Sequence, residues 1–496
     1  MRIAIIATYV HPTRQIRKEC SVMQSAVPEL IASLCPASAE IEIYNEKEAA
    51  IPLDRDWDLV IFSYLHSAYE HTKVLSTLFR RRGVKTVAGG RHAVHFAADC
   101  VRHFDAVVTG DPEPNVPRLV ADFERGRLQP LYTARGSILD VRPYRWDLID
   151  YKNNRFRLPG IEASRGCPFS CSFCVLPGRE RFACRPVRQV IDEISTRLSW
   201  NRNLFGLMDN CFIFLDNNLG GSPAYLKELC EALVPLRKTW GCAVTFNVLR
   251  NQALVRLMAK AGCRYVYTGL ESLDAKVLAS MNKGQNRVGE VDEVIRRCFA
   301  AGMLLSFGLL IGSDEDTGDY LESLPQYLED LHYFSVTFLG IVCPYPGTAF
   351  FAKLAGEGRL LPGATIRDFD GYTLCHRPKH LAPDEVADHF QRLCRRLGRF
   401  RNVASHYWTR LGASDQPHYR WAVLGSGLEI RSIRNPLGNP ARQYVAGLDP
   451  LESWDAGMMD ALGLQPQRIG KETDDHLVEH VPLISTRDGL ARTDAG

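Results

Sequence analysis

The sequence predicts an α/β protein built around two parallel sheets. Strand-like apolar runs alternate with helical patterns as far as residue 357, which is typical of parallel sheets covered by helices. Glycines and small polar residues follow the strands of the first series, and a cysteine-rich loop opens the second. We expect a Rossmann-like doubly wound sheet, a linker, a partial (β/α)6 TIM-like barrel and an α-rich C-terminal extension with a mobile tail. Their expected bounds are 1–130, 131–158, 159–357 and 358–496.

Composition limits the class of protein. The 496 residues exceed what one ordinary core holds, and 46% hydrophobic with 24% charged residues is typical of a soluble globular chain. The net charge is only +3, and the one basic triplet, Arg80–Arg82, fits the cationic end of a helix. We therefore expect no nucleic-acid partner. No leader or membrane span is expected either, and the fifteen scattered cysteines favour the reducing cytoplasm.

The first series supplies five expected strands, with a helix of clear apolar face at 68–82. The strands are expected at 2–7, 40–44, 57–64, 85–88 and 105–109. Ligands of such sheets lie at the carboxyl ends of the strands, where glycine lets them approach the backbone. The residues that follow the strands there are Ser63, Tyr64, Gly89, Gly90, Gly110 and Glu113. For any one of the glycines, ordinary turn chemistry remains the alternative.

The second series gives six βα units, which are expected to curl into a partial barrel with its site at the strand carboxyl ends. Its strands are expected at 160–163, 210–216, 243–248, 264–269, 304–311 and 334–342. Its helices are expected at 186–200, 223–236, 252–261, 274–281, 288–301 and 320–331. A further helix is expected at 383–399, and the last hundred residues are loop-like.

Three cysteines lie on the loop after the first strand of this second series. Cys167, Cys171 and Cys174 are separated by three and then two residues, so their thiolates can converge on one metal centre. Three thiolates leave one iron of a four-iron cluster open, which a reactive cluster requires. Zinc is the alternative metal and needs a fourth ligand, for which Cys184 is available. Three ordinary buried thiols are the simplest alternative.

This cysteine spacing, with Phe173 before the last cysteine, resembles the radical SAM superfamily. The resemblance extends to strand-end motifs: Gly269 to Ser272, Leu310 to Gly312, Pro344 to Thr348 and Asp216 to Asn218. It implies a [4Fe-4S] cluster on the three cysteines and S-adenosylmethionine (SAM) on the open iron. The residues it implies for SAM contact are Phe173, Asp216, Glu271, Ser272 and Gly312.

These residues also have simpler interpretations. Glu271 suits a salt bridge at the end of the barrel, and Phe173 suits plain packing. Asp216 and Asn218 suit the cap of the next helix as well as a functional role. Cys343 faces the barrel mouth if the predicted fold holds, although a packed thiol is the simpler interpretation.

Residues 1–130 resemble the cobalamin-binding domain that precedes many radical SAM cores. The resemblance implies cobalamin contact by Ser63, Tyr64, Gly89, Gly90, Gly110 and Glu113. Two departures stand beside it. The Asp-x-His-x-x-Gly signature of cobalt-ligating proteins is absent, and the usual Gly-Glu-Gly-Glu reads Gly110-Asp111-Pro112-Glu113.

The resemblance implies a chemistry. A reduced cluster cleaves SAM to a 5′-deoxyadenosyl radical, which abstracts hydrogen from an unactivated carbon. Methylcobalamin then supplies a methyl group and a second SAM restores it, with a donor such as flavodoxin or ferredoxin giving electrons. The expected activity is methylation of a small molecule or natural-product intermediate. A non-methylating reaction, such as ring formation, rearrangement or scaffold tailoring, and a sensor without turnover are the alternatives.

Overall fold

The structure is a computed structural model of the chain. It describes residues 1–9, 26–46, 51–148, 158–176, 182–197, 210–331, 334–362, 364, 368–399, 404, 407–409 and 411–412. The tail expected after about Gly470 lies outside the described residues, as do Trp421, Tyr444 and Trp454 of the segment expected to be loop-like.

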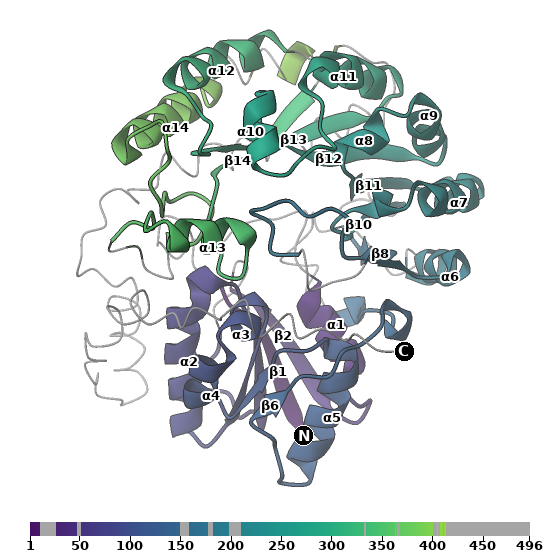
Figure 1. Cartoon of the computed structure of the whole chain (residues 1–496). Coiled ribbons are helices and arrows are strands. Elements are labelled where there is room, and N and C mark those ends of the chain that lie inside the picture. Colours follow the sequence, from purple (N-terminus) through teal and green to yellow (C-terminus); the bar gives the residue numbers. More distant parts are fainter. Residues whose placement is uncertain are drawn as a thin grey trace, which may run out of the picture.

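The N-terminal sheet has six parallel strands in the order β2-β1-β3-β4-β5-β6. These are β1 (Arg2–Ala7), β2 (Glu40–Asn45), β3 (Leu59–Ser63), β4 (Lys85–Gly89), β5 (Ala106–Val108) and β6 (Leu131–Tyr132). Helices α1 (Val27–Leu34) and α5 (Pro112–Glu124) cover one face. The short helix η1 (His66–Ala68), α2 (Tyr69–Arg81), α3 (Arg91–His95) and α4 (Ala97–His103) cover the other, as Figure 1 shows.

Strand β1 shows why this sheet is doubly wound. Ile3 and Ile5 point into the core shared with α1 and α5, whereas Ala4 and Ile6 point into the core shared with α2. All four side chains are fully buried, so the strand is a continuous apolar run with no polar face. This pattern needs helices on both sides.

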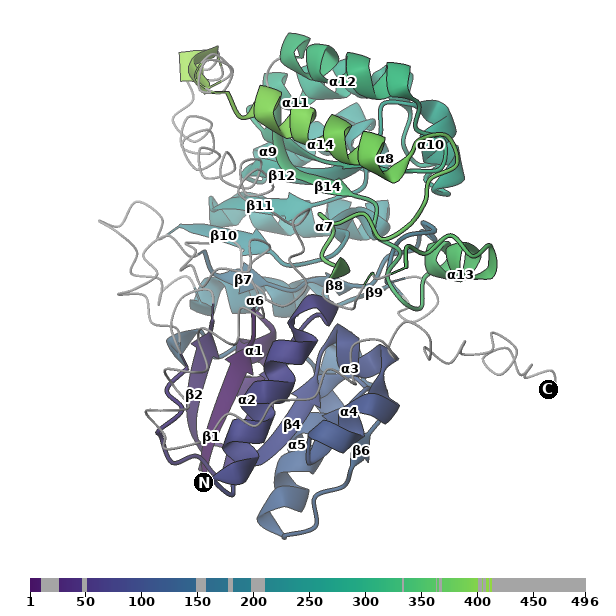
Figure 2. The same ribbon diagram turned by 90° about the vertical axis from the view of Figure 1, so that its left-hand side faces the viewer.

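The barrel sheet is a second parallel array of six strands, in the order β14-β13-β12-β11-β10-β7. Its strands are β7 (Gly160–Ile161), β10 (Cys211–Phe214), β11 (Thr239–Ala243), β12 (Cys263–Glu271), β13 (Leu304–Ile311) and β14 (Phe334–Ile341). The edge strands β7 and β14 do not pair with each other, so the sheet is an open arc, and this confirms the predicted partial barrel. Figure 2 shows the strands with helices along their outer side.

The helices that pack against the barrel core are α6 (Val187–Arg197), α7 (Pro223–Leu233), α8 (Phe246–Leu249), α9 (Gln252–Lys260), α11 (Val291–Ala300), α12 (Gly318–Asp330) and α14 (Pro383–Leu397). Helices α10 (Ala275–Ser280) and α13 (Ala349–Gly356) instead share a smaller apolar cluster with Phe173. Helix α14, predicted within the C-terminal extension, contributes Val386, Phe390 and Leu393 to the barrel core. Arg396 at its end pairs with Glu329 on α12 at 2.6 Å.

Two elements differ from the sequence expectation. The strand expected at 243–248 is wrong: β11 ends at Ala243 and the chain then forms α8. Gly241 interrupts the apolar run of β11, which hides the strand in the sequence. The glycine is needed there because an added Cβ would lie only 3.2 Å from Tyr265. In addition, the segment predicted as a linker contains a strand, β6, which pairs with β5.

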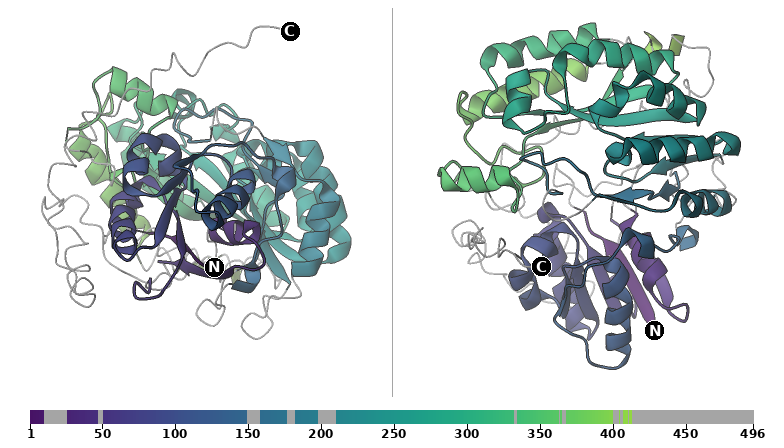
Figure 3. Two further views of the ribbon diagram at one scale, coloured as in Figure 1. Left: turned by 90° about the horizontal axis from the view of Figure 1, so that it is seen from below. Right: turned by 45° about the vertical axis from the view of Figure 1, so that its right-hand side comes forward.

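The carboxyl ends of the N-terminal strands point toward the barrel (Figure 1). Phe369 and Cys375, which follow the barrel strands, pack in the same core as Phe62 and Tyr64. Figure 3 shows the two units against each other from two further directions, with α13 beside the N-terminal unit. The two predicted site regions therefore meet at one boundary. Among the described residues, no helix is both long and apolar enough to cross a membrane.

Candidate cofactor site

The cysteine loop is held by backbone hydrogen bonds to two distant segments. It follows the short strand β8 (Ser164–Arg165), which pairs with β9 (Ala183–Cys184). Ser172 N donates to Met281 O at 3.0 Å, and its own carbonyl accepts from Phe350 N at 2.9 Å. Gly166 has φ 87°, a conformation that favours glycine, and this turns the chain into the loop. The loop is thus hydrogen-bonded to the C-terminal end of α10 and to the start of α13.

Two amides contact the cysteine sulfurs. Asn218 Nδ2 lies 3.6 Å from Cys167 Sγ, and Gln285 Nε2 lies 3.5 Å from Cys171 Sγ. Burial raises the pKa of the Cys174 thiol, and the nearby Cys171 and Cys167 raise it further. The structure therefore brings the three predicted cysteines within electrostatic reach of one another. Among the described residues, no group of three or more His, Cys, Asp or Glu side chains is arranged to hold a single metal ion.

Asp216 holds the chain that leads into this loop. It is 4% exposed, and its carboxylate accepts from Ala163 N at 3.2 Å and from Ser164 Oγ at 2.5 Å. Burial raises its pKa to about 7. Neither Asp216 nor Asn218 caps α7 through its side chain, because Ser222 fills that position. Asn218 instead accepts from Thr245 N at 3.2 Å and donates to Cys167.

Glu271 lies at the end of β12 in a left-handed conformation, with φ 66°. A non-glycine residue in this region is uncommon and worth explaining by function. Its carboxylate pairs with the ammonium group of Lys283, and both side chains are buried. The Lys283 ammonium lies 5.6 Å from the centre of the Phe173 ring, which connects this pair to the cysteine loop. Phe173 itself packs against an apolar cluster that includes Val277 and Met281.

Ser272 and Gly312 line the ends of the next strands. Ser272 is fully buried, and its hydroxyl lies 2.9 Å from the Tyr320 hydroxyl. Gly312 has φ 87°; its N–H donates to Asp316 Oδ2 at 2.7 Å, and its carbonyl is 2.9 Å from His376 Nε2. Of the five residues predicted for SAM contact, four lie at or just after the carboxyl ends of barrel strands, and Phe173 lies on the cysteine loop.

The predicted cobalamin edge lies across the boundary. Ser63 pairs in register with Gly89 at the ends of β3 and β4, and Tyr64 N donates to Gly89 O at 3.2 Å. Gly90 has φ 98°, and an added Cβ would lie 2.4 Å from Tyr64 O, so only glycine fits. Tyr64 is buried, and its hydroxyl lies 3.4 Å from Cys100 Sγ.

Gly110 and Glu113, which follow β5, both make contacts within the fold. A Cβ on Gly110 would lie 2.1 Å from Ala134 O, because the chain after β6 passes directly over it. Glu113 is 6% exposed and accepts from Arg165 at 2.8 Å. Arg165 precedes the first cysteine by two residues and also pairs with Glu162 at 2.7 Å.

Three histidines at this edge were not predicted as site residues. His66 follows β3, whereas His92 and His95 lie on α3 after β4. The Nδ1 atoms of His66 and His92 are 3.1 Å apart, and the ring centres of His66 and His95 are 5.4 Å apart. An added Cβ at Gly347 would lie 2.5 Å from His95, so the barrel approaches the cluster closely. The sequence signal was their position directly after two strand ends.

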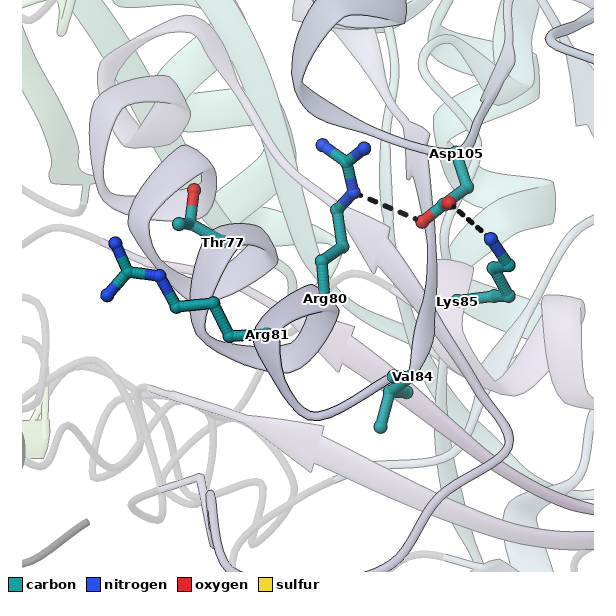
Figure 4. Close-up of a pocket in the computed structure, with 7 residues that line it drawn as sticks. Thr77, Arg80, Arg81, Val84, Lys85 and Asp105 are labelled. Atoms are coloured by element: carbon teal, nitrogen blue, oxygen red, sulfur yellow. Dashed lines mark hydrogen bonds and ion pairs between the residues drawn. The ribbon is translucent and has the colours of Figure 1, made fainter. Parts of the chain in front are cut away.

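A cavity of about 360 Å³ lies at the opposite edge of the N-terminal sheet (Figure 4). Its residues are Thr77, Arg80, Arg81, Gly83, Val84, Lys85 and Asp105. Asp105 pairs with Lys85 at 2.9 Å and with Arg80 at 3.5 Å, so it neutralises much of the basic lining. The cavity lies before β4 and β5 begin and is separate from the strand carboxyl ends.

Comparison with known proteins gives a family match within the barrel. Residues 161–324 match the family model of the radical SAM superfamily. Bacteriochlorophyllide d C-8(2)-methyltransferase of Chlorobaculum tepidum is 26% identical over 359 residues, or 70% of this chain and 78% of that protein. Bacteriochlorophyllide d C-12(1)-methyltransferase of the same organism is 23% identical, over 74% of this chain and 81% of that protein.

Among solved structures, the fold is similar to that of TsrM from Kitasatospora setae, a radical S-adenosylmethionine methyltransferase with cobalamin and [4Fe-4S] cluster bound. The TM-score is 0.61 at 16% identity, covering 88% of this chain and 99% of that one. The likeness shows a shared fold over both units.

Proposed function

Because residues 161–324 of this chain form a radical SAM domain, we propose that the whole chain is a cobalamin-dependent radical SAM methyltransferase. Its substrate class is a small molecule or natural-product intermediate, methylated at an unactivated carbon. One observation carries the proposal: the cysteine loop and the carboxyl edge of the N-terminal sheet meet, with Arg165 bridging to Glu113 at 2.8 Å. Chemistry that needs both cofactors requires such a boundary.

The barrel supplies the residues for the cluster and for SAM. Cys167, Cys171 and Cys174 would hold three irons of a [4Fe-4S] cluster, and each sulfur would bind a different iron. This suits three thiols on one short loop, of which Cys171 and Cys167 lie close enough to Cys174 to raise its pKa. Asn218 and Gln285 would donate to the ligating sulfurs, and such contacts tune the potential of a cluster.

For SAM, the buried Glu271–Lys283 pair offers opposite charges beside the cysteine loop. Glu271 would bind the amino group of SAM, and Lys283 would remain beside it as the buried counter-charge. Phe173, Ser272, Gly312 and Asp216 complete the proposed SAM-side set, with Asp216 acting through the loop that it holds. When bound, the cluster and SAM would supply a carbon-centred radical, and the methyl group would come from cobalamin.

The N-terminal edge fits a large flat cofactor in two respects. Gly90 has no room for a side chain against Tyr64, so backbone is brought to the edge where a ligand approaches. Leu65, next to Tyr64, is 63% exposed although it lies at the boundary of two packed units, so it offers apolar surface to a ligand there. Ser63, Tyr64, Gly89, Gly90, Gly110 and Glu113 remain the proposed cobalamin set, with Glu113 also bound to Arg165.

The proposed reaction needs an external low-potential reductant, for which flavodoxin or ferredoxin is the natural class in the cytoplasm. Each methylation would consume two SAM molecules. One leaves as 5′-deoxyadenosine and methionine, and the other leaves as S-adenosylhomocysteine. The two nucleoside products therefore accumulate together only if methyl transfer occurs.

The test is anaerobic purification with added hydroxocobalamin, followed by iron and cobalt analysis and a UV–visible spectrum. We expect a full four-iron cluster together with bound cobalamin. Incubation with SAM and a reductant should then give 5′-deoxyadenosine, and a true substrate should add S-adenosylhomocysteine and a mass gain of one methylene. Protein that takes up zinc but no iron would refute the proposal.

A second candidate is a radical SAM reaction without methylation. It is favoured by Pro112, a rigid residue that stands where related domains carry a small one. A full cluster without cobalt, with 5′-deoxyadenosine but no S-adenosylhomocysteine, would select this candidate.

A further inference from the structure

Two buried histidines at the carboxyl edge of the N-terminal sheet form a pair with an unusual hydrogen-bond arrangement. His66 is 2% exposed and His92 is 1% exposed, and their Nδ1 atoms are 3.1 Å apart. Within the described part of the chain, the Nε2 atom of each has no hydrogen-bond partner. Buried polar atoms are nearly always paired, so two such nitrogens in one pair call for an explanation.

The proton count of this pair is fixed by chemistry. Both rings are buried, where a charged imidazolium is costly, so both are neutral. A neutral imidazole carries one N–H, and the Nδ1 contact needs one donor and one acceptor. The ring that donates through Nδ1–H must therefore have an unprotonated Nε2. That nitrogen holds a buried lone pair without a partner, which is the form that binds a metal.

The two histidine rings have different surroundings. His92 is stacked between Tyr69, at 3.8 Å between ring centres, and Phe96, at 4.7 Å. Its position is fixed by these aromatic faces. His66 comes immediately after the exposed Leu65 and lies 6.0 Å from the ring of Tyr345, which belongs to the barrel. His66 is thus the member of the pair that faces the boundary between the units.

We propose that His66 is the axial nitrogen ligand of the cobalt when cobalamin is bound, and that His92 is the positioning residue that accepts its Nδ1–H. The inference rests on the proposed function, because it needs cobalamin at this edge. It assigns the ligand to the segment after β3. The signature that supplies a cobalt-binding histidine in other cobalamin proteins is absent from this sequence.

Electron paramagnetic resonance of the full-length protein tests this ligand directly. The protein is made in a histidine auxotroph with natural or ¹⁵N-ring histidine, loaded anaerobically with hydroxocobalamin and reduced to the cobalt(II) state. An axial ¹⁴N splits each high-field cobalt line into three, and ¹⁵N splits it into two. We expect three lines with natural histidine and two with the labelled amino acid.

Variants identify which histidine it is. His66→Ala should abolish the histidine splitting, and free imidazole should restore a three-line pattern in the labelled variant. His92→Phe keeps the aromatic stack but removes the acceptor, so the splitting should persist with an altered coupling. His103→Ala is the matched control, because this histidine lies on α4 of the same unit with its side chain 34% exposed. It should leave the spectrum unchanged.

The outcomes separate the two claims. A three-line splitting that is the same with natural and with ¹⁵N-labelled histidine would mean that the cofactor's own base binds cobalt. A spectrum without nitrogen splitting would mean that the axial ligand is not nitrogen. Either result overturns the inference while leaving the proposed function intact, as would labelled splitting that survives His66→Ala. Protein that binds no cobalamin would overturn both claims. If His66→Ala does not fold, the labelled wild-type protein still decides whether the ligand is histidine.

Discussion

Arg165 and Glu113 form an ion pair of 2.8 Å that joins strand β8, which leads into the cysteine loop, to the start of helix α5. The Glu113 side chain is 2% exposed and that of Arg165 is 19% exposed. Glu162 shares the same guanidinium at 2.7 Å, so one cation serves two carboxylates at the boundary of the units. The pair couples the position of the proposed cluster to that of the proposed cobalamin edge.

Removing Arg165 should therefore destabilise the protein strongly. Arg165→Met leaves the buried Glu113 and the partly buried Glu162 without their cation, and breaking a buried pair costs about 3–5 kcal/mol. Adding Glu113→Gln should recover part of the loss, because it removes one of the stranded charges. Denaturant unfolding of the two single variants and the double variant measures the coupling. Additive effects in that cycle would show that the pair contributes nothing beyond its separate residues.

The cysteine loop makes a prediction about metal content. Cys167→Ala, Cys171→Ala and Cys174→Ala should each lose the four-iron cluster after anaerobic reconstitution, since three protein ligands leave none to spare. Cys184→Ala is the control, because Cys184 lies on β9, outside the loop. It should keep its full iron and labile sulfide. Loss of metal in Cys184→Ala, with zinc in the wild-type protein, would instead indicate a four-ligand zinc site.

Much of this fold was predictable because local patterns agreed with tertiary packing. Strand β13 was expected at 304–311 and has those bounds, since it is a continuous apolar run buried on both faces. The cysteines were identifiable because a single loop carries all three. Strand β11 was displaced because Gly241 weakens its pattern where Tyr265 packs. Local sequence patterns thus predict a strand correctly where all of its side chains are buried.

The polar contacts of the site were not predictable in the same way. The sequence indicated Glu271 but not its partner Lys283, which comes twelve residues later, beyond α10. His66 and His92 are separated by 26 residues, and only the parallel pairing of β3 with β4 brings them together. Asp216 was expected to contact SAM or to cap a helix, and its hydrogen bond with Ser164, which lies 52 residues before it, was not expected. Such pairs depend on register, which no local pattern contains.

Asp216 should make stability depend on pH in a defined direction. Burial raises its pKa to about 7 in the folded protein, whereas an unfolded aspartate titrates near pH 4. The folded state thus binds the extra proton between these values, so its stability is greatest at low pH and falls as pH rises through about 7. Asp216→Asn should flatten this part of the profile. Unfolding of both proteins between pH 5 and about 8 checks it, and parallel profiles would contradict the assignment.

Gly90 should be irreplaceable for two separate physical reasons. Its φ of 98° is strained for any other residue, and an added Cβ would lie 2.4 Å from the carbonyl oxygen of Tyr64, a backbone atom directly after β3. Gly83 is a matched control in the same unit: its φ is 81°, but nothing lies within 4 Å of an added Cβ. Gly83→Ala should therefore cost about 1 kcal/mol from backbone strain alone.

Gly90→Ala adds a backbone clash to that strain and should cost clearly more than Gly83→Ala, with a total of about 3 kcal/mol. Because the clash displaces the segment that carries Tyr64 and His66, cobalamin retention should fall in Gly90→Ala and stay at the wild-type level in Gly83→Ala. Thermal unfolding and the cobalt content after gel filtration measure the two effects. Equal losses of stability in both variants would show that the Tyr64 contact is not the reason for the glycine. Unchanged cobalt in a destabilised Gly90→Ala would separate this edge from the cofactor.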